Sequence, residues 1–446
     1  MRRLLWAGAL VCLPIFGFAE KIELTRHIGA YGEGKAPTTE EFFGVAGTAT
    51  LIIQGPRRDL RIRLNGAEVG LVEGAGDDGI SVQLVADNSL EVVALDPVTV
   101  RVEQVADIEL NVLSRVHFNT NVSDFERSRA FYGKLGFKTL SGFPDTNTLA
   151  MAEAIGVETP TAYDGSQGGE AGGYLLHGEL ISAGGFGGGV IDLIQFTIPR
   201  DETSPYEMVN HLGMARAVLH TTDLSGDFAK LSEVGVQFVS APVQRDDGSR
   251  FVLFHDPDGT FYELLEVDAE VEGERDETAA TNIVELGALN INVSDFQRSV
   301  AWYKMLGYEL DSELASTDNA EVAQAMGFDE PYRLKGAVLV HKVDGSIIEL
   351  VQWLEPFNPE PPYAVPINHL GIHRTAFSTT DIAGDVAALQ AQGVELVSPV
   401  TPCCSGPDSW GGIVAFYDPD GTIVELVEQP VMNAILKVTN WLGDLF

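Results

Sequence analysis

The sequence has few cysteines and few basic residues for its length. Cys12, Cys403 and Cys404 are the only cysteines, which excludes both a disulfide framework and a zinc ribbon. Lys and Arg number 28 against 65 Asp and Glu, a net charge of −37. Nucleic acid is therefore excluded as a partner, because phosphate binding needs clustered positive charge. Hydrophobic residues make up 45% of the 446 residues, enough for real cores and for several domains of roughly 100–200 residues.

Long apolar runs are also absent, except at the N-terminus. Arg2 and Arg3 precede an apolar run from Leu4 to Phe18, and Ala19 is followed by Glu20. A basic start, a short apolar stretch and a small residue at the end are typical of a secretory signal peptide. The run is short for a membrane span, which needs ~20 apolar residues. We therefore expect residues 1–19 to be removed and the protein to be periplasmic or secreted, with no membrane span.

Residues 20–112 show the alternation of β-strands and no helical period. Apolar or β-branched runs separated by turn residues predict several short strands, and hence a small antiparallel β-sandwich. No group of catalytic residue types lies in this part of the chain, so we interpret it as an accessory domain. The predicted strands are 49–53, 60–64, 80–85, 90–93 and 98–102.

The rest of the chain is an internal repeat. Residues 119–128 recur as residues 290–299, and Asn-His-Leu-Gly at 210–213 recurs at 368–371. Asp-Pro-Asp-Gly-Thr occurs at 256–260 and again at 418–422. Two copies of one domain therefore follow each other, joined by an acidic linker at 268–285.

Each copy also divides into two similar halves. A half begins with an alternating strand, continues with a helix and ends with three strands. Ser123 and Glu126 have the spacing of a capping box at the start of the first helix, and Ser294 and Gln297 repeat it. Asp-Pro-Asp-Gly is strong turn chemistry, because Pro presets φ and Gly adopts a positive φ.

These motifs resemble those of the vicinal oxygen chelate superfamily. Val-Ser-Asp-Phe-x-Arg-Ser, a later Leu-Gly-Phe/Tyr and the Asp-Pro-Asp-Gly-Thr turn carry the resemblance, which covers 113–267 and 286–429. The superfamily includes glyoxalase I, fosfomycin-resistance proteins, methylmalonyl-CoA epimerase and extradiol dioxygenases. The resemblance implies an α+β fold of βαβββ modules, in which each pair of modules curls into a half-open barrel, here called a cup. We expect one cup at 113–267, a second at 286–429 and a C-terminal helix over 430–446.

Members of this superfamily typically hold one divalent metal in the cup, with ligands on the first and last strands of each module. Carried over position by position, the first-strand sites are His117, Arg216, Ala288 and Arg374, and the last-strand sites are Asp192, Glu263, Glu349 and Glu425. With the two modules of each copy paired, the first cup would hold His117, Asp192, Arg216 and Glu263. The second would hold Ala288, Glu349, Arg374 and Glu425.

The two predicted cups differ in their chemistry. Arg cannot ligate a metal, because its guanidinium has only donors and stays charged. In the second cup Arg374 would balance two carboxylates without any metal. In the first cup, His117, Asp192 and Glu263 are three plausible ligands for Zn, Ni, Mn or Fe. Binding of a small molecule through Arg216, and a purely hydrogen-bonded core, remain open alternatives.

Three functions follow from the resemblance. The first is a glyoxalase-like lyase or isomerase in which Glu263 moves a proton beside the metal. The second is a metal-free protein that binds a small organic molecule. The third, an extradiol dioxygenase, is disfavoured because Ala288 and Arg374 occupy positions where iron ligands are expected. The predicted substrate-binding residues are Asn119, Arg216, His220, Glu349, Arg374 and Glu425. A homo-oligomer is an open possibility.

One register error would change this interpretation. His373 precedes Arg374, so on a regular strand it faces away from the cup. A slip by one residue would turn its imidazole inward beside Glu425 and restore a metal ligand.

Overall fold

The protein was analysed as a computed structural model. No described helix is both long and apolar enough to cross a membrane. Three features discussed above lie outside the described residues. They are the expected signal peptide, Cys404 and most of the expected C-terminal helix. The structure describes residues 22–31, 38–43, 47–54, 60–69, 80–84, 87–93, 98–106, 110–142, 147–184, 189–268, 280–392, 394–403, 411–430 and 433–434.

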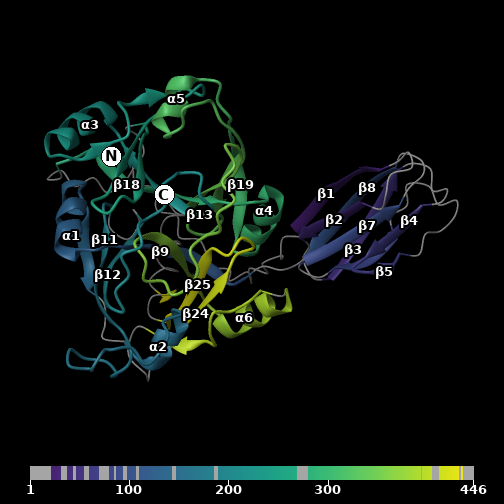
Figure 1. Ribbon diagram of the computed structural model, residues 1–446, viewed down its shortest axis with the longest axis horizontal. Helices are drawn as coiled ribbons and strands as arrows, with labels where there is room; N and C mark the ends of the chain where they lie inside the picture. The colour runs from purple at the N-terminus through teal and green to yellow at the C-terminus, as the bar shows by residue number, and fades with distance from the viewer. Residues whose placement is uncertain are drawn as a thin grey trace, which may run out of the picture.

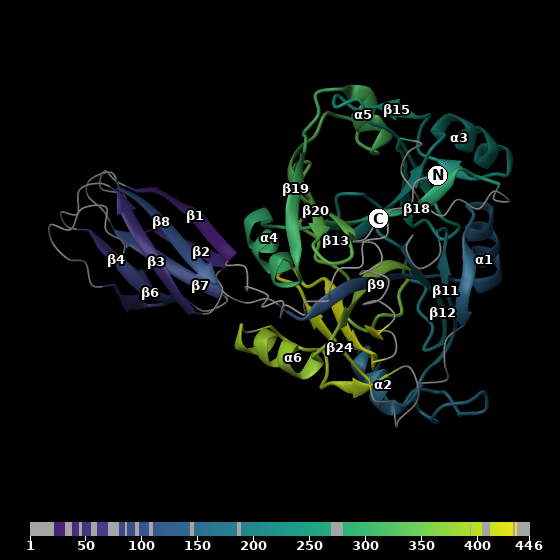
Figure 2. The same cartoon turned by 180° about the vertical axis from the view of Figure 1, so that it is seen from behind.

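The N-terminal domain is the predicted β-sandwich. Its two sheets have the strand orders β1-β8-β3-β6 and β2-β7-β4-β5, and their buried side chains form one core. Alternation places that core: Ile62 and Leu64 on β4 are buried, whereas Arg61 and Arg63 are exposed. Sequence analysis missed β1 and β2. Figures 1 and 2 show this domain beside the main body, next to α4. The strands are β1 (Ile22–Tyr31), β2 (Thr38–Phe43), β3 (Gly47–Gln54), β4 (Arg61–Leu64), β5 (Ala67–Glu68), β6 (Ile80–Leu84), β7 (Asp87–Val93) and β8 (Val98–Ala106).

The first and fourth modules form one eight-stranded sheet. Its order is β10-β11-β12-β9-β22-β25-β24-β23, and β9 and β22 join the modules as antiparallel neighbours. In Figure 1 the blue strands of the first module lie beside the yellow strands of the fourth. The strands are β9 (Val112–Asn121), β10 (Lys138–Gly142), β11 (Leu175–Ser182), β12 (Ile191–Ile198), β22 (Gly371–Thr379), β23 (Thr401–Pro402), β24 (Gly412–Tyr417) and β25 (Ile423–Glu428).

The second and third modules form the other large sheet. Its order is β14-β16-β17-β13-β18-β21-β20-β19, with β15 paired to β16. Here β13 and β18 are the antiparallel neighbours at the junction. The strands are β13 (Gly213–Thr221), β14 (Gln237–Phe238), β15 (Val243–Gln244), β16 (Arg250–His255), β17 (Phe261–Glu266), β18 (Ile283–Asn292), β19 (Tyr308–Leu314), β20 (Arg333–His341) and β21 (Ile347–Glu355).

The expected pairing of modules within each sequence copy is therefore wrong. Each cup takes one module from each copy: the first with the fourth, and the second with the third. The repeat motifs define each module but do not determine which other module it pairs with, because the first strands of all four modules have similar unpaired edges. This exchange regroups every candidate site residue.

The repeated motifs join modules of different cups. Asp258, in the first Asp-Pro-Asp-Gly turn, accepts hydrogen bonds from the backbone N–H of Ser123 at 3.0 Å and from its hydroxyl. The N-cap of the following helix is Asp124, whose carboxylate accepts from Arg127 N–H at 3.0 Å. The expected capping box at Ser123 is thus replaced by a cap one residue later. Asp420, Ser294 and Asp295 repeat the arrangement. The helices are α1 (Phe125–Lys134), α2 (Leu149–Ala154), α3 (Leu224–Glu233), α4 (Phe296–Met305), α5 (Ala320–Ala325) and α6 (Ile382–Ala391).

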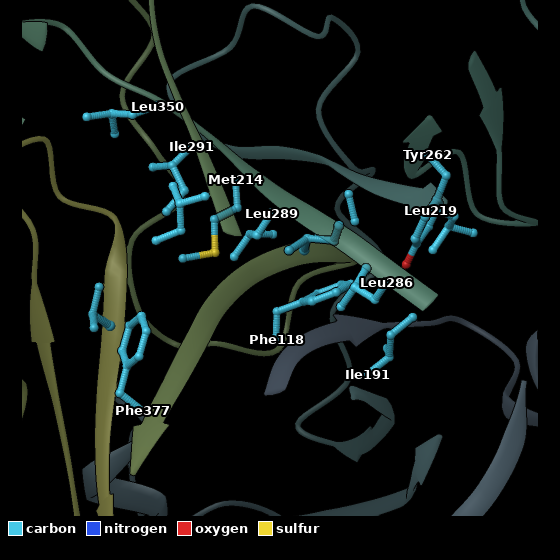
Figure 3. Packing of buried hydrophobic residues seen from close by; sticks show 14 of the residues in the cluster. Phe118, Ile191, Met214, Leu219, Tyr262, Leu286, Leu289, Ile291, Leu350 and Phe377 are labelled. Carbon is cyan, nitrogen blue, oxygen red and sulfur yellow. The ribbon is translucent and has the colours of Figure 1, made fainter. Parts of the chain in front are cut away.

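The two large sheets share one apolar core. Alternate residues of their central strands, such as Phe118 on β9 and Leu289 on β18, are fully buried in it. Figure 3 shows these side chains gathered between the strands, with Tyr262 and Ile191 at one end and Phe377 at the other. Because side chains alternate along a strand, the intervening residues face the opposite surfaces, which are the two cups.

Candidate ligand-binding site

The first cup, called here the open cup, takes its polar floor from four strands. His117 lies on β9, Asp192 on β12, Arg374 on β22 and Glu425 on β25. The registers bring them together, because Asp192 is opposite Asn119 on β9 and Arg374 is opposite the same residue from the other side. Two residues come from each sequence copy.

Arg374 bridges the two carboxylates of this floor. Its Nη2 donates to Asp192 Oδ2 at 3.1 Å, and its Nε lies 3.3 Å from Glu425 Oε2. His117 Nδ1 is 3.8 Å from Asp192 Oδ2, which is too long for a hydrogen bond. Asp192 and Glu425 are almost fully buried. One guanidinium is thus shared by two buried carboxylates.

A cavity of 460 Å³ opens above this floor. His117, Asp192, Arg374 and Glu425 all line it, and Glu179 and His177 lie further along the wall. No described residue hydrogen-bonds to His117 Nδ1, Asp192 Oδ1 or Glu425 Oε2. Buried polar groups normally have partners, because an unmet one costs about 1–3 kcal/mol. These atoms therefore mark a place where a ligand's polar group would be bound.

Apolar side chains form part of the cavity wall, which also includes Asn147 and Gln167. Met151 and Ile155 come from the segment of α2, Phe196 from β12 and Ile413 from β24. Cys403, which is disulfide-bonded, also lines the cavity. A polar floor beneath apolar walls is the usual composition of a small-molecule site.

Burial controls the protonation of the floor. It lowers the pKa of His117 to about 3, helped by the positive charge of Arg374, so the imidazole is neutral. Burial raises the pKa of Asp192 to about 7; Arg374 opposes this rise and Glu425 adds to it. Burial also raises the pKa of Glu425, again against Arg374. The floor has one more carboxylate than a single arginine can balance.

The second cup, called the closed cup, has the same kind of floor with one addition. Arg216 Nε donates to Glu263 Oε2 at 3.1 Å, and its Nη2 donates to Glu349 Oε2 at 2.5 Å. Arg245 then donates from Nη2 to Glu263 Oε1 at 2.6 Å. Burial alone would raise the pKa of Glu263, but Arg245 and Arg216 together hold it below its usual value. Two arginines and two glutamates balance in this cup.

Apolar residues pack over the closed cup. Arg245 lies 3.6 Å from the centre of the Phe251 ring, a cation–π contact. Phe251 belongs to a buried cluster with Phe328, Tyr332 and Trp353. Arg245 and Phe251 thus lie beside the polar floor of the second cup, which is called closed because Arg245 completes its ion pairs.

The structure separates the three predicted metal ligands. Glu263 lies on β17, in a different sheet from His117 and Asp192, and is engaged by two arginines. The predicted catalytic role of Glu263 beside that metal therefore loses its basis. The expected pairing of Arg374 with Glu349 is also wrong, because Glu349 binds Arg216 and Arg374 binds Asp192.

Two predicted substrate-binding residues have other partners. Asn119 Nδ2 donates to Asn121 Oδ1 at 2.8 Å, and Asn119 is not among the residues that line the cavity. His220 Nδ1 is 2.8 Å from Glu285 Oε1. Its ring lies against Gly287, where an added Cβ would be 2.1 Å from Nε2. His220 is therefore held by β18 and not aimed at a ligand.

The slip that would turn His373 inward does not occur. A register shift does lie between Ile372 and Arg374, and His373 Nε2 is 2.8 Å from Asn121 Nδ2, but His373 is not among the residues that line the cavity. Arg245 and the apolar wall were not predicted from the sequence. Only a comparison of the two copies beyond their shared motifs, in the segment before β16 and β24, would have found Arg245.

The family expectation of a divalent metal was tested against the donors of the open cup. His117, Asp192 and Glu425 are suitable ligand types, but the Arg374 guanidinium bridges the two carboxylates that would bind the ion. Arg374 also repels a dication. Among the described residues, no group of three or more His, Cys, Asp or Glu side chains has the arrangement of a metal site. The residues present do not fit a metal ion.

Comparison with known proteins places the chain in a family. Among solved structures, maize (Zea mays) glyoxalase I is similar at 17% identity, covering 73% of this chain and 95% of its own, with a TM-score of 0.49. A putative dioxygenase from Bacillus subtilis shares 14% identity over 72% of this chain and 86% of its own, with a TM-score of 0.45. A Mn(II)-bound glyoxalase from Novosphingobium aromaticivorans shares 15% identity over 72% and 83%, with a TM-score of 0.24.

No curated protein matches the chain. The family model of the glyoxalase/bleomycin resistance protein/dioxygenase superfamily matches residues 114–264 and 285–426. These two segments are the two sequence copies, and together they make up more than half of the chain. The chain therefore belongs to the glyoxalase/bleomycin resistance protein/dioxygenase superfamily, with two tandem vicinal oxygen chelate domains.

Proposed function

We propose that the protein binds a small organic molecule in the open cup without a metal ion. The observation that carries this proposal is the 460 Å³ cavity, whose floor has polar atoms without protein partners. A cavity of this size holds a molecule of drug-like dimensions. Its apolar walls would supply affinity, and the floor would orient the ligand's polar group.

Arg374 supports the metal-free part of the proposal. A guanidinium that bridges Asp192 and Glu425 supplies about one positive charge where relatives place an ion. Removing it would leave two buried carboxylates facing each other, which costs several kcal/mol. Arg374 is thus a structural part of the cup as well as a candidate ligand contact.

The test uses the neutral fluorescent probe N-phenyl-1-naphthylamine. We expect it to bind the full chain with one site, and to bind equally well after dialysis against EDTA. Met151→Trp, which fills the apolar wall, should abolish this binding. Leu310→Trp is the matched control, because Leu310 is half exposed on β19 and away from the cavity lining. Binding lost with EDTA, or unchanged in Met151→Trp, would refute the proposal.

We also propose that the protein is exported. The basic, then apolar, then small-residue order of residues 1–19 supports this. N-terminal sequencing of the mature protein should begin at Glu20, and a chain that begins at Met1 would refute it.

A further inference from the structure

The two sequence copies place Arg245 and Cys403 at equivalent positions. Arg245 is the first residue after β15, and Cys403 is the first residue after β23. The strand registers agree. Gln244 pairs with Arg250 in the closed cup as Pro402 pairs with Gly412 in the open cup.

The same registers tie these positions to the floor glutamates. On the neighbouring strands Glu263 is opposite Leu253, and Glu425 is opposite Ala415. Phe251 lies two residues before Leu253 in the closed cup, and Ile413 lies two residues before Ala415 in the open cup. Phe251 and Ile413 are therefore equivalent positions. Arg245 and Phe251 thus fill the position where Cys403 and Ile413 border the cavity.

In the closed cup, two cations balance the two buried carboxylates of the floor. Two carboxylates, Glu263 and Glu349, are balanced by Arg216 from the strand and by Arg245 from the loop. Both oxygens of Glu263 are engaged by a guanidinium. The second cation completes the charge balance of this buried network.

The open cup has the same floor without the second cation. Asp192 and Glu425 share Arg374, which is the only Lys or Arg among the described residues that line the cavity. The fourth module cannot supply another, because the sequence has no Lys or Arg between residues 375 and 436. Asp192 Oδ1 accepts no hydrogen bond from a described residue, and Glu425 Oε2 has only its ion-pair contact with Arg374 Nε at 3.3 Å. These oxygens are acceptors for a donor that carries positive charge.

We propose that the ligand of the open cup carries a guanidinium or ammonium group that takes the place of Arg245, with an apolar body against Met151, Phe196 and Ile413. This inference rests on the proposed function and names its ligand class. A neutral donor would satisfy the free oxygens but would leave the extra carboxylate unbalanced. A carboxylate ligand would add to the imbalance. The net charge of −37 also attracts cations to the protein.

The test compares three probes that share one apolar chain: octylguanidinium, octanol and octanoate. Isothermal titration calorimetry of the full chain at about pH 8, where Asp192 is mostly ionised, should show octylguanidinium binding at least about tenfold more tightly than octanol, a difference of ~1.4 kcal/mol. Octanoate should bind more weakly than octanol. Titrations in buffers of different ionisation enthalpy should show a proton released when the cation binds near pH 7.

Cys403→Arg puts the second cation into the chain itself and should abolish octylguanidinium binding. Cys403→Ala is the matched comparison, because Cys403 is disulfide-bonded and both variants lose that bond. The difference between them isolates the added guanidinium. Circular dichroism of both variants checks that they are folded; if Cys403→Arg is not, Ile413→Arg is the second route to the same charge.

The outcomes separate the two proposals. If octanol or octanoate binds as tightly as octylguanidinium, the inference of a cationic ligand is wrong and the proposed function stands. If octylguanidinium binds equally to Cys403→Arg and Cys403→Ala, the inference is also wrong. If none of the three probes binds at millimolar concentration, the inference is wrong, and the N-phenyl-1-naphthylamine titration alone decides the proposed function.

Discussion

The two cups have the same kind of polar floor but differ in what lies above it. In each, one arginine on the first strand of a module contacts two carboxylates, one on the adjacent strand and one two strands away. In the closed cup a second arginine and a cluster of aromatic side chains complete the packing. In the open cup a disulfide-bonded cysteine and an isoleucine stand at the corresponding positions, and a cavity remains.

This difference shows that the first-strand arginine alone does not decide whether a cup is a core or a site. Arg216 and Arg374 make similar contacts to their carboxylates. The loop after β15 or β23 decides, because it either returns a cation to the floor or leaves the floor one cation short. On our proposal, a connecting loop on a shared scaffold therefore determines which cup binds a ligand.

The largest expected effect is on the stability of the closed cup. Glu263→Gln removes the carboxylate between Arg216 and Arg245 and leaves two guanidiniums with one glutamate. We expect the free energy of unfolding to fall by about 3–5 kcal/mol, the usual cost of breaking a buried ion pair. Chemical denaturation measures it. The matched variant in the open cup, Asp192→Asn, should lose no stability at pH 7, because Arg374 keeps Glu425 and burial already disfavours the charged form of Asp192. Equal losses in the two variants would contradict the difference between the cups.

Opening the closed cup gives the next largest effect. Arg245→Ala should leave one arginine, Arg216, between two carboxylates, Glu263 and Glu349, as Arg374 stands between two carboxylates in the open cup. We expect octylguanidinium to gain a second binding site per chain, counted by calorimetry. Phe251→Leu is the control, since it enlarges the cup but keeps Arg245 in place. An unchanged number of sites in Arg245→Ala would mean that the surrounding apolar cluster, and not Arg245, closes this cup.

The pH dependence of stability should differ between the native chain and Asp192→Asn. The folded-state pKa of Asp192 is about 7 and its ordinary value is 3.8, so folding favours the protonated form. The stability that this proton contributes is fully present below about pH 4 and is lost as the pH rises through about 7. Asp256 and Asp418 also have raised pKa values, and both remain in the variant. The melting temperature of Asp192→Asn, relative to the native chain, should therefore rise between about pH 4 and pH 7 and stay level above it. A constant difference would show that Asp192 does not titrate in this range.

Much of this architecture could be predicted from the sequence. The Asp-Pro-Asp-Gly turns, the Ser-Asp motifs and the alternating strands define the modules, because each encodes local geometry. The family resemblance, carried over position by position, also placed Arg216 and Arg374 in the cups. Module pairing could not be predicted, since it depends on which free edge of β9 or β13 meets which neighbour, and no local pattern encodes that choice.

Errors in the site follow from the same cause. Glu263 was grouped with His117 because the two lie in one sequence copy, although the sheets place them in different cups. His220 shares a strand with Arg216, yet Glu285 on the neighbouring strand binds its ring. Arg245 was overlooked because it lies in a loop, where no periodicity indicates the direction of a side chain.

The most direct test of the account is zinc binding by Arg374→Ala. If the guanidinium takes the place of a cation, its removal should free His117, Asp192 and Glu425 to bind one zinc ion per chain. Equilibrium dialysis followed by metal analysis should then find zinc in Arg374→Ala and none in the native chain. Stoichiometric zinc in the native chain, lost in His117→Ala, would contradict the account.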